Sequence, residues 1–519
     1  MKKTRRPFST KHVFLPLLLA FSSASPAAEP AKPIATKPNI IVILVDDMGY
    51  SDLGCYGSEI QTPNLDKLAA SGIRFTEFYN MSRCCPSRAA ILTGLYPHQA
   101  GIGLMQENLG LPAYQGHLND NCVTLAEVLK SAGYATAICG KWHVGGTDYQ
   151  PSPWMRGFDH GISSIQGGFY YAQVDKQGNP PLRKSLWLDG KQLPNDSPAL
   201  PKDWYTTDVW TDYGIKYINQ AVAEKKPFFL YLAYNAPHFP LQAPAADIAK
   251  YRGKYLAGWD KLRAQRYQWQ LAHGIIDPAW ALSPLPESQP DLKDVVPWDS
   301  LNEKQKNRFD HIMAIYAACV DHMDQGVGRL VDDLKKQGAM DNTLIFFLSD
   351  NGGNLEGGPN GTTEKGKGEL GSADSTVFCG ESWATLENTP FRYYKHFEHE
   401  GGISSPLIVH WPDGIKAAGI ITKERAQIID IMATCVDVAG AKYPTEFNGH
   451  KILPLEGQSM APVFTGGKLA SYPMFREHEE NEAIIDGDWK LVRPHGSPWE
   501  LYNLAKDRTE LHNLAAQEP

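Results

Sequence analysis

Three absences narrow the protein classes that this chain can represent. Positive charge is not in excess, because 50 Lys and Arg residues stand against 58 Asp and Glu residues, giving a formal net charge of −8. No basic stripe occurs outside the extreme N-terminus, so we expect no nucleic-acid partner. The eight cysteines form no C-x-x-C pair, which disfavours a zinc ribbon or a redox dithiol. No segment after residue 28 is apolar enough to span a bilayer, so we expect no stable membrane association.

The N-terminus has the pattern of an export signal. Basic residues between positions 2 and 6 precede a short apolar run at 13–21 and small residues up to Ala28. This order is typical of a cleaved secretory signal, whereas an uncleaved anchor would need a longer apolar run. We therefore expect residues 1–28 to be the signal peptide of a periplasmic or secreted bacterial protein. Export permits disulfides, but the sequence does not indicate which cysteines pair.

Most of the chain alternates between buried-strand and helix patterns. Continuous apolar, β-branched runs such as residues 39–45 suit strands that are covered on both faces, as in a parallel sheet. Further strands are predicted at residues 73–79, 135–139, 228–233, 343–348 and 406–410, with helices starting at Thr62, around Leu125 and across residues 307–337. This alternation predicts an α/β fold whose large, mostly parallel sheet lies between layers of helices.

The organisation changes near the C-terminus. Four short strand patterns occur at residues 472–477, 482–485, 489–492 and 500–504, and a final helical turn is predicted at 509–514. Meander spacing and the Asp486-Gly487 hairpin signal predict a small antiparallel sheet. We therefore expect a large α/β domain over residues 37–465 and a small subdomain over 466–519. Two stretches rich in Pro and aromatic residues, 145–203 and 242–300, interrupt the main pattern, either as substrate walls or as surface loops.

Polar side chains follow two of the predicted strands. Asp46 and Asp47 follow the first strand, and Asp350 and Asn351 follow a later one. The carboxyl ends of parallel strands are where ligands bind in such sheets. Oxygen donors of this kind suit a hard cation such as Ca²⁺ or Mg²⁺ better than zinc. Either pair alone is also explained by the preference of Asp for strand ends and helix caps.

Residues 84–94 carry the most specific motif of the chain. They read Cys-Cys-Pro-Ser-Arg-Ala-Ala-Ile-Leu-Thr-Gly, or C-x-P-S-R-x-x-x-L-T-G. A helix start with Pro86 in its first turn explains part of this pattern, but it requires neither the Arg nor the Leu-Thr-Gly. The motif resembles the one by which type I sulfatases have a cysteine converted to formylglycine. Cys84 is the residue in register, and Cys85 occupies a variable position.

Other segments strengthen this resemblance. Residues 133–143 are similar to the second sulfatase motif, G-Y-x-T-x-x-x-G-K-x-H, which a strand would deliver to its carboxyl end. Residues 235–240 are similar to the Ala-Pro-His segment of the family, and residues 395–402 to its Lys followed by Glu-Gly-Gly. The resemblance runs from about residue 39 to residue 513, and it implies an alkaline phosphatase-like fold.

The resemblance also implies a set of site residues. One Ca²⁺, with Mg²⁺ as the alternative, would be bound by Asp46, Asp47, Asp350, Asn351 and the modified Cys84. The implied catalytic residues are Cys84, Arg88, Lys141, His143, His238 and Lys395. The hydrated aldehyde (3-oxoalanine) from Cys84 would attack sulfur, with Asp350 accepting its proton. Arg88 and Lys141 would stabilise charge, and His238 with Lys395 would serve the leaving group. His143 would take the last proton, and a formylglycine-generating enzyme would be the maturation partner.

The implied function is hydrolysis of a sulfuric ester, of the arylsulfatase type, on an aryl sulfate or, as we favour, a sulfated glycan. Two alternatives remain: a phosphodiesterase or phosphonate monoester hydrolase on the same fold, and a catalytically silent glycan-binding protein. Hydrogen-bonding candidates for substrate recognition are His98, Gln99, His396, Glu398, His399, Glu477, His478 and Glu479. Candidate stacking aromatics are Trp154, Phe169, Tyr170 and Tyr171, each of which also fits a core position.

Overall fold

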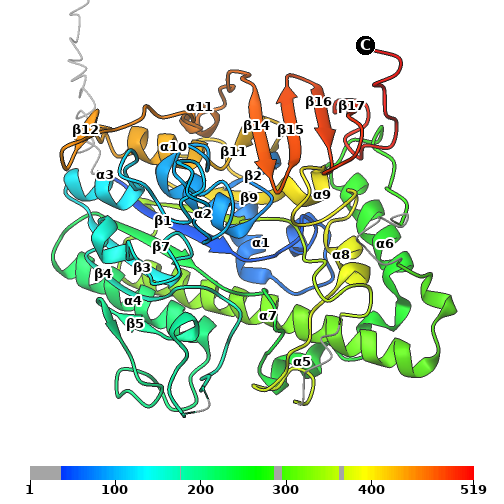
Figure 1. Cartoon of the computed structure of the whole chain (residues 1–519), viewed down its shortest axis with the longest axis horizontal. Coiled ribbons are helices and arrows are strands. Elements are labelled where there is room, and N and C mark those ends of the chain that lie inside the picture. Colours follow the sequence, from blue (N-terminus) through cyan, green and yellow to red (C-terminus); the bar gives the residue numbers. More distant parts are fainter. Residues whose placement is uncertain (1–36, 176, 286–294, 362–367, 519) are drawn as a thin grey trace, which may run out of the picture. The chain divides into compact units, whose positions relative to one another are not determined.

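The computed structural model describes residues 37–175, 177–285, 295–361 and 368–518. Residues Lys37–Pro519 cluster into one compact unit, shown in Figure 1. The predicted signal peptide at 1–28 lies outside the described residues. No helix in the described part of the chain has the length and hydrophobicity required to cross a membrane.

An 11-stranded mixed sheet forms the centre of this unit, in the order β10-β2-β9-β8-β1-β7-β3-β4-β5-β6, with β11 paired to β2. Its central strand β1 pairs in parallel with both β7 and β8, whereas β9 runs antiparallel to β2 and β8. The strands are β1 (Asn39–Val45), β2 (Ile73–Tyr79), β3 (Ala135–Lys141), β4 (His160–Ser164), β5 (Trp187–Leu188), β6 (Lys191–Gln192), β7 (Phe228–Ala233), β8 (Thr343–Ser349), β9 (Ser404–His410), β10 (Ile420–Thr422) and β11 (Ala426–Gln427). The mixed, mostly parallel sheet predicted from the sequence is confirmed.

The apolar run of β1 is explained by cores on both faces of the sheet. Ile41, Ile43 and Val45 belong to the core on one face. The alternating residues Ile40, Val42 and Leu44 belong to the core on the other face. One face is covered by helices α1 (Pro63–Ala70), α4 (Thr206–Ala223), α5 (Ala245–Tyr251), α6 (Trp259–Ala272), α7 (Glu303–Lys336) and α8 (Glu381–Glu387). The opposite face is covered by α2 (Cys84–Thr93), α3 (Leu125–Ser131), α10 (Asp430–Val438) and α11 (Ala461–Phe464). Figure 1 shows α7 and α10 on opposite sides of the sheet.

The C-terminal strands form a separate four-stranded antiparallel sheet, as predicted. It comprises β14 (Met474–His478), β15 (Asn481–Asp486), β16 (Trp489–Arg493) and β17 (Glu500–Asn503). Its small core includes Met474, Ile485 and Val492, together with Tyr79 and Ile403 from outside the sheet. Within the described ranges, the remaining elements are α9 (Glu400–Ile403), the hairpin β12 (Glu446–Phe447) with β13 (His450–Lys451), and five short 3-10 helices, Gly54–Tyr56, Pro153–Arg156, Leu182–Lys184, Lys254–Ala257 and Trp298–Ser300.

Three local predictions differ from the structure. Helix α7 begins at Glu303 rather than 307, because Asn302 and Gln305 form a capping box that starts the helix earlier. The stretch 145–203 is not only loop, since β4 extends the central sheet in parallel with β3. Residues 509–514 are mostly irregular instead of a helical turn, and the Asp507 carboxylate accepts the backbone N–H groups of Leu511 and His512.

Candidate active site

The carboxyl ends of four neighbouring strands bring polar residues to one edge of the sheet. Val45 of β1 is in register with Ser349 of β8, and Gly140 of β3 is in register with Ala233 of β7. The residues that follow therefore meet although they are far apart in the sequence. This edge carries Asp46, Asp47, Lys141, His143, His238, Asp350 and Asn351.

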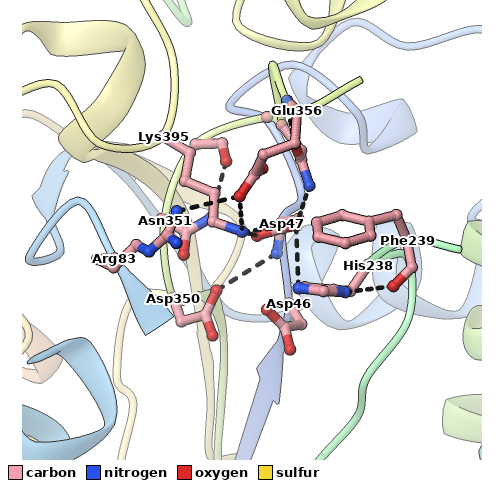
Figure 2. A network of polar contacts seen from close by, with 12 residues as sticks. Asp46, Asp47, Arg83, His238, Phe239, Asp350, Asn351, Glu356 and Lys395 are labelled. Carbon is pink, nitrogen blue, oxygen red and sulfur yellow. Dashed lines mark hydrogen bonds and ion pairs between the residues drawn. The ribbon is translucent and has the colours of Figure 1, made fainter. Parts of the chain in front are cut away.

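Asp47 contacts several residues of the cluster, as Figure 2 shows. Its two carboxylate oxygens lie 2.7 Å and 3.0 Å from the Lys395 ammonium. The side-chain amide of Asn351 donates to it at 2.8 Å, and that of Asn354 donates at 2.5 Å. Asp47 has a left-handed backbone, φ 66°, a strained conformation that is concentrated at functional sites.

Asp46 and Asp350 share Arg88 as a buried counter-ion. The guanidinium lies 2.8 Å from Asp350 and 3.4 Å from Asp46, and Lys141 lies 2.5 Å from Asp46. Burial alone would raise the pKa of Asp46, but Lys141, His238 and Arg88 outweigh it and lower that pKa. For Asp350, burial and the neighbouring Asp46 charge prevail and raise the pKa well above its usual value.

Cys84 is the first residue of helix α2 and is 2 % exposed. The helix start is held by Ser87, whose hydroxyl accepts from the Met81 N–H at 2.9 Å and donates to the Asp350 carbonyl at 2.5 Å. A hydrogen bond from Cys85 and the charge of Lys141 lower the pKa of the Cys84 thiol despite its burial. Burial raises the pKa of Cys85 instead. The surroundings of residue 84 therefore favour an anion at its side chain.

Two histidines flank this centre. The ligand atoms of Cys84, Cys85 and His143 lie within 4.8 Å of one another, and burial together with Lys141 lowers the pKa of His143 to about 4. On the other side, His238 Nδ1 lies 2.5 Å from the Phe239 carbonyl oxygen. Its Nε2 lies 3.6 Å from Asp47 Oδ2. Nε2 is therefore the nitrogen that faces the cluster, while Nδ1 is placed to donate its proton to the Phe239 carbonyl.

The oxygen donors of this cluster fit a divalent cation. Asp46 Oδ1 and Asn351 Oδ1 are buried and have no hydrogen-bond partner within the described ranges. Buried oxygens are normally paired, and a hard cation accepts electron pairs from carboxylate and amide oxygens. Asp46, Asp47 and His238 also place ligand atoms within 4.8 Å of one another. The donor set thus suits Ca²⁺ or Mg²⁺ better than a thiophilic metal.

Sequence reasoning missed part of the support for these residues. Asn354 contacts Asp47, and Glu356 lies 3.5 Å from Lys395 and 3.1 Å from Arg83. The only sequence signal was their position in a polar loop soon after the strand that ends at Ser349. All residues expected at the site lie in the cluster or directly against it.

The structure divides the predicted recognition residues into two groups. His98 and Glu477 pair at 2.5 Å and are partly exposed, as are His396 and Glu479 at 3.0 Å. Gln99 is also partly exposed and donates to Glu456 at 2.7 Å. The others, Glu398, His399 and His478, are buried. Among the aromatics, Phe169 and Tyr170 are core residues, and Trp154 and Tyr171 are half-buried.

All eight cysteines fall within the described residues, where each is a buried free thiol. The disulfides that export would permit are therefore not formed in this structure. Most of these thiols lie in apolar cores, for example Cys139 and Cys435, where burial raises the thiol pKa and makes the thiol unreactive. Cys84 is the exception, with its lowered pKa.

Comparison with known proteins identifies the family. A family model described as Sulfatase matches residues 38–441. The chain belongs to the sulfatase family. A second model, described as N-sulphoglucosamine sulphohydrolase, C-terminal, matches residues 391–519 of this sulfatase. The resemblance seen in the sequence motifs is confirmed, and the sulfatase is a hydrolase of sulfate esters.

Relatives match over nearly the whole length of this sulfatase. An uncharacterized sulfatase from Schizosaccharomyces pombe is 36% identical, covering 93% of this chain and 91% of the relative. An arylsulfatase from Klebsiella aerogenes is 33% identical, covering 82% and 92%. Among solved structures, Ps i-CgsB is 30% identical with a TM-score of 0.66, covering 93% of this chain and 89% of that chain. The same protein is also known in complex with k-i-k-neocarrahexaose.

Proposed function

We propose that this sulfatase hydrolyses a carbohydrate sulfate ester with a formylglycine nucleophile derived from Cys84. The observation that carries the proposal is the position of Cys84. It is buried at the start of α2, beside His143, and close enough to Lys141 for that charge to lower its pKa. A thiol in a purely structural role would lie in an apolar core, as Cys139 and Cys435 do.

The proposed cation is Ca²⁺, with Asp46, Asp47, Asp350, Asn351 and residue 84 as its ligands. When bound, the cation would polarise the sulfate oxygens, and the formylglycine would supply a hydrated-aldehyde nucleophile. The two unpartnered oxygens, Asp46 Oδ1 and Asn351 Oδ1, support this ligand set. The Mg²⁺ alternative uses the same oxygens and is distinguished by titration with each metal.

Arg88 and Lys141 are proposed to stabilise negative charge on the sulfate. Arg88 is 0 % exposed and is held by three groups: Asp46, Asp350 and the Lys141 carbonyl oxygen at 3.0 Å. Such fixed, buried donors need little reorganisation as charge develops in the transition state. Asp350, which Arg88 orients, is proposed to accept the proton of the attacking hydroxyl.

The leaving oxygen is proposed to receive its proton from Nε2 of His238, which acts as the imidazolium because Nδ1–H is donated to the Phe239 carbonyl. The contact between Nδ1 and the Phe239 carbonyl orients the ring so that Nε2 faces the cluster beside Asp47. Lys395 approaches the same carboxylate, as Figure 2 shows. Its positive charge would stabilise the developing alkoxide. His143, on the Cys84 side, is proposed to accept the proton released when sulfate departs.

A sulfated sugar is the substrate class that we favour. The partly exposed pairs His98–Glu477 and His396–Glu479 provide donors and acceptors for sugar hydroxyls at the rim of the centre. The complex of Ps i-CgsB with an oligosaccharide supports this preference. The family match favours sulfate over phosphate esters, and the complete set of catalytic candidates argues against a silent glycan-binding protein.

Three related expectations remain part of the proposal. Residues 1–28 would direct export to the periplasm or medium, and a formylglycine-generating enzyme would mature the chain. The catalytic domain would span residues 37–465 and the C-terminal subdomain residues 466–519. Expression of the chain without a maturation enzyme should yield mostly unmodified, inactive thiol at residue 84.

The test is sulfate release from a panel of monosulfated sugars and one aryl sulfate by the enzyme co-expressed with a formylglycine-generating enzyme. Release from one sugar regioisomer, at a higher kcat/KM than from the aryl ester, is the expected result. Release from the aryl ester alone would contradict the sugar assignment. Release of phosphate from phosphate esters at a higher kcat/KM than sulfate from any sulfate ester would overturn the reaction class.

A further inference from the structure

A second cluster of metal-ligand side chains lies beside the proposed reaction centre. His396, His478 and Glu479 each place one ligand atom within 4.8 Å of the others. His396 follows Lys395, whereas His478 ends β14 and Glu479 begins the turn to β15. The proposed proton-transfer and charge-stabilising steps use none of these side chains, although His396 and Glu479 are among the residues proposed to recognise the sugar.

His478 is the unusual member of this cluster. Its side chain is 0 % exposed, yet neither ring nitrogen has a hydrogen-bond partner among the described residues. Buried polar groups are nearly always paired, so an unpaired buried imidazole calls for a ligand. Its Nε2 lies 3.8 Å from Glu479 Oε1. The free nitrogen therefore faces the other members of the cluster.

The other two members open the cluster to solvent. His396 Nδ1 lies 3.0 Å from Glu479 Oε2, and their side chains are 22% and 44% exposed. An ion could therefore enter from outside, and water could occupy a further coordination position. His396 Nε2 points away from the cluster, toward Glu356 at 3.5 Å and toward Arg83. Arg83 is itself paired with Glu356 at 3.1 Å, and the same carboxylate oxygen lies 3.5 Å from Lys395.

We propose that His396, His478 and Glu479 form a Zn²⁺ site at the rim of the active centre. Two imidazole nitrogens and one carboxylate oxygen, with a fourth position left open, are a common ligand set for zinc. The same set is poor for Ca²⁺, which prefers oxygen ligands. Rotations of the partly exposed His396 and the exposed Glu479 side chains would close the ligand atoms to bonding distances of about 2.0–2.2 Å.

The two sites differ in ligand type and should therefore bind different metals. The centre around Asp46, Asp47, Asp350 and Asn351 offers mainly oxygen, whereas the rim cluster offers mainly nitrogen. Zinc bound at the rim would draw Glu479 and His396 toward the metal and change the surface that a sugar meets. Because a third candidate group, Cys84 with Cys85 and His143, also contains soft ligands, the test must locate the metal as well as count it.

The first experiment is equilibrium dialysis of the mature enzyme, saturated with Ca²⁺, against ZnCl₂ with metal analysis. One equivalent of Zn²⁺ is expected, with at least tenfold weaker binding in Glu479→Gln. Glu480→Gln is the matched control, since Glu480 is the adjacent turn residue and pairs with His495 at 2.9 Å. It should bind Zn²⁺ like the unchanged enzyme. Equal affinity in Glu479→Gln and Glu480→Gln would overturn the proposal.

The second experiment is X-ray diffraction from Zn²⁺-soaked crystals at the zinc absorption edge. An anomalous peak between His396, His478 and Glu479 supports the proposal. Peaks confined to the Cys84 group or to the Asp46 group would overturn it. Because His478 is buried, its substitution would also test folding, whereas Glu479 and His396 are exposed enough for their variants to report on metal binding.

Discussion

Lys395 and Asp47, 348 positions apart in the sequence, form a buried ion pair in which Nζ lies 2.7 Å and 3.0 Å from the two carboxylate oxygens. Both side chains are 1% exposed. Burial alone would lower the pKa of Lys395, but Asp47 and Glu356 raise it, so the ammonium stays charged. The pair joins the end of β1 to the loop before α9 and places a fixed positive charge where the leaving group is proposed to lie.

Replacing Lys395 should therefore reduce catalysis. We expect Lys395→Met to lower kcat/KM by about 10²- to 10³-fold, the usual loss for removal of one transition-state electrostatic partner. Steady-state assays of sulfate release measure the effect. Lys416→Met, at an exposed lysine whose ammonium donates to the Asp413 carbonyl, is the control and should keep full activity. An unchanged kcat/KM for Lys395→Met would show that Lys395 does not stabilise the transition state.

Adjacent cysteines provide a matched pair for the nucleophile. Cys84→Ala should lower turnover at least about 10³-fold, because no other side chain at that position can supply the nucleophile. Cys85→Ala removes a buried thiol of the apolar core and should retain activity with a modest loss of thermal stability. Circular dichroism of both variants checks that they fold. Equal activities of the two variants would contradict the assignment of Cys84.

Chelation should inactivate the enzyme and make it less stable. Without a cation, the carboxylates of Asp46, Asp47 and Asp350 lose their proposed ligand. A ligand that binds only the folded state stabilises it by about 2.7 kcal/mol at one hundred times its Kd, so EGTA should lower Tm. Added Ca²⁺ should restore both activity and Tm. An enzyme that keeps full activity after exhaustive chelation and metal analysis would contradict the metal site.

His322 is expected to give the fold a pH-dependent contribution. It connects α7 to α5 and α4, with Nδ1 at 2.7 Å from Asp247 and Nε2 at 3.1 Å from Asp208. Burial lowers the pKa of His322, but the two carboxylates outweigh it and raise that pKa above 6.5. The charged His322 therefore contributes its full stabilisation of the folded state below pH 6.5, and this contribution declines as pH rises through the folded-state pKa.

The measurement for this prediction is chemical unfolding of the unchanged protein and of His322→Gln at several pH values. The difference in unfolding free energy should be largest near pH 6 and should shrink at alkaline pH. His512→Gln, at a largely exposed histidine, serves as the control and should show a far smaller pH-dependent difference. A difference for His322→Gln that grows with rising pH would contradict the raised folded-state pKa of His322.

Lys490 should hold the C-terminal sheet in place. Its ammonium lies 3.0 Å from Glu400 and 2.7 Å from Glu510, and all three side chains are 0% exposed. Lys490→Met removes the positive charge that pairs with the buried Glu400 and Glu510 carboxylates, and this loss should lower the unfolding free energy by about 3–5 kcal/mol. Lys451→Met, at an exposed lysine of β13, is the comparison. Similar denaturation midpoints for the two variants would show that the buried pair contributes little.

The sequence predicted the main features of the fold for identifiable reasons. The run at residues 39–45 is apolar at every position because both faces of β1 are covered. The strands β4 to β6 escaped prediction because they are short and half-polar, for example Lys191–Gln192 with both residues exposed. Their place in the sheet depends on successive pairing, of β4 with β3, β5 with β4 and β6 with β5, and not on local pattern.

The sequence indicated which residues could form the candidate site, but it did not indicate which side-chain contacts hold them. Asp46, Asp47, Asp350 and Asn351 were indicated by their position after strands. By contrast, the contact between Asn354 and Asp47 depends on how the loop after β8 folds back, which no local pattern records. His399 and Glu398 looked like recognition residues because of their type, but the short helix α9 and its neighbours bury them.

The central claim is that residue 84 acts as a formylglycine in sulfate ester hydrolysis. The most direct test measures two quantities on the same samples, at several levels of co-expressed formylglycine-generating enzyme. These are the fraction of the residue 84 peptide that carries an aldehyde, by mass spectrometry, and the rate of sulfate release from a monosulfated sugar. We predict that the rate is proportional to the aldehyde fraction and vanishes with it. Sulfate release from protein whose residue 84 is entirely thiol would contradict the account.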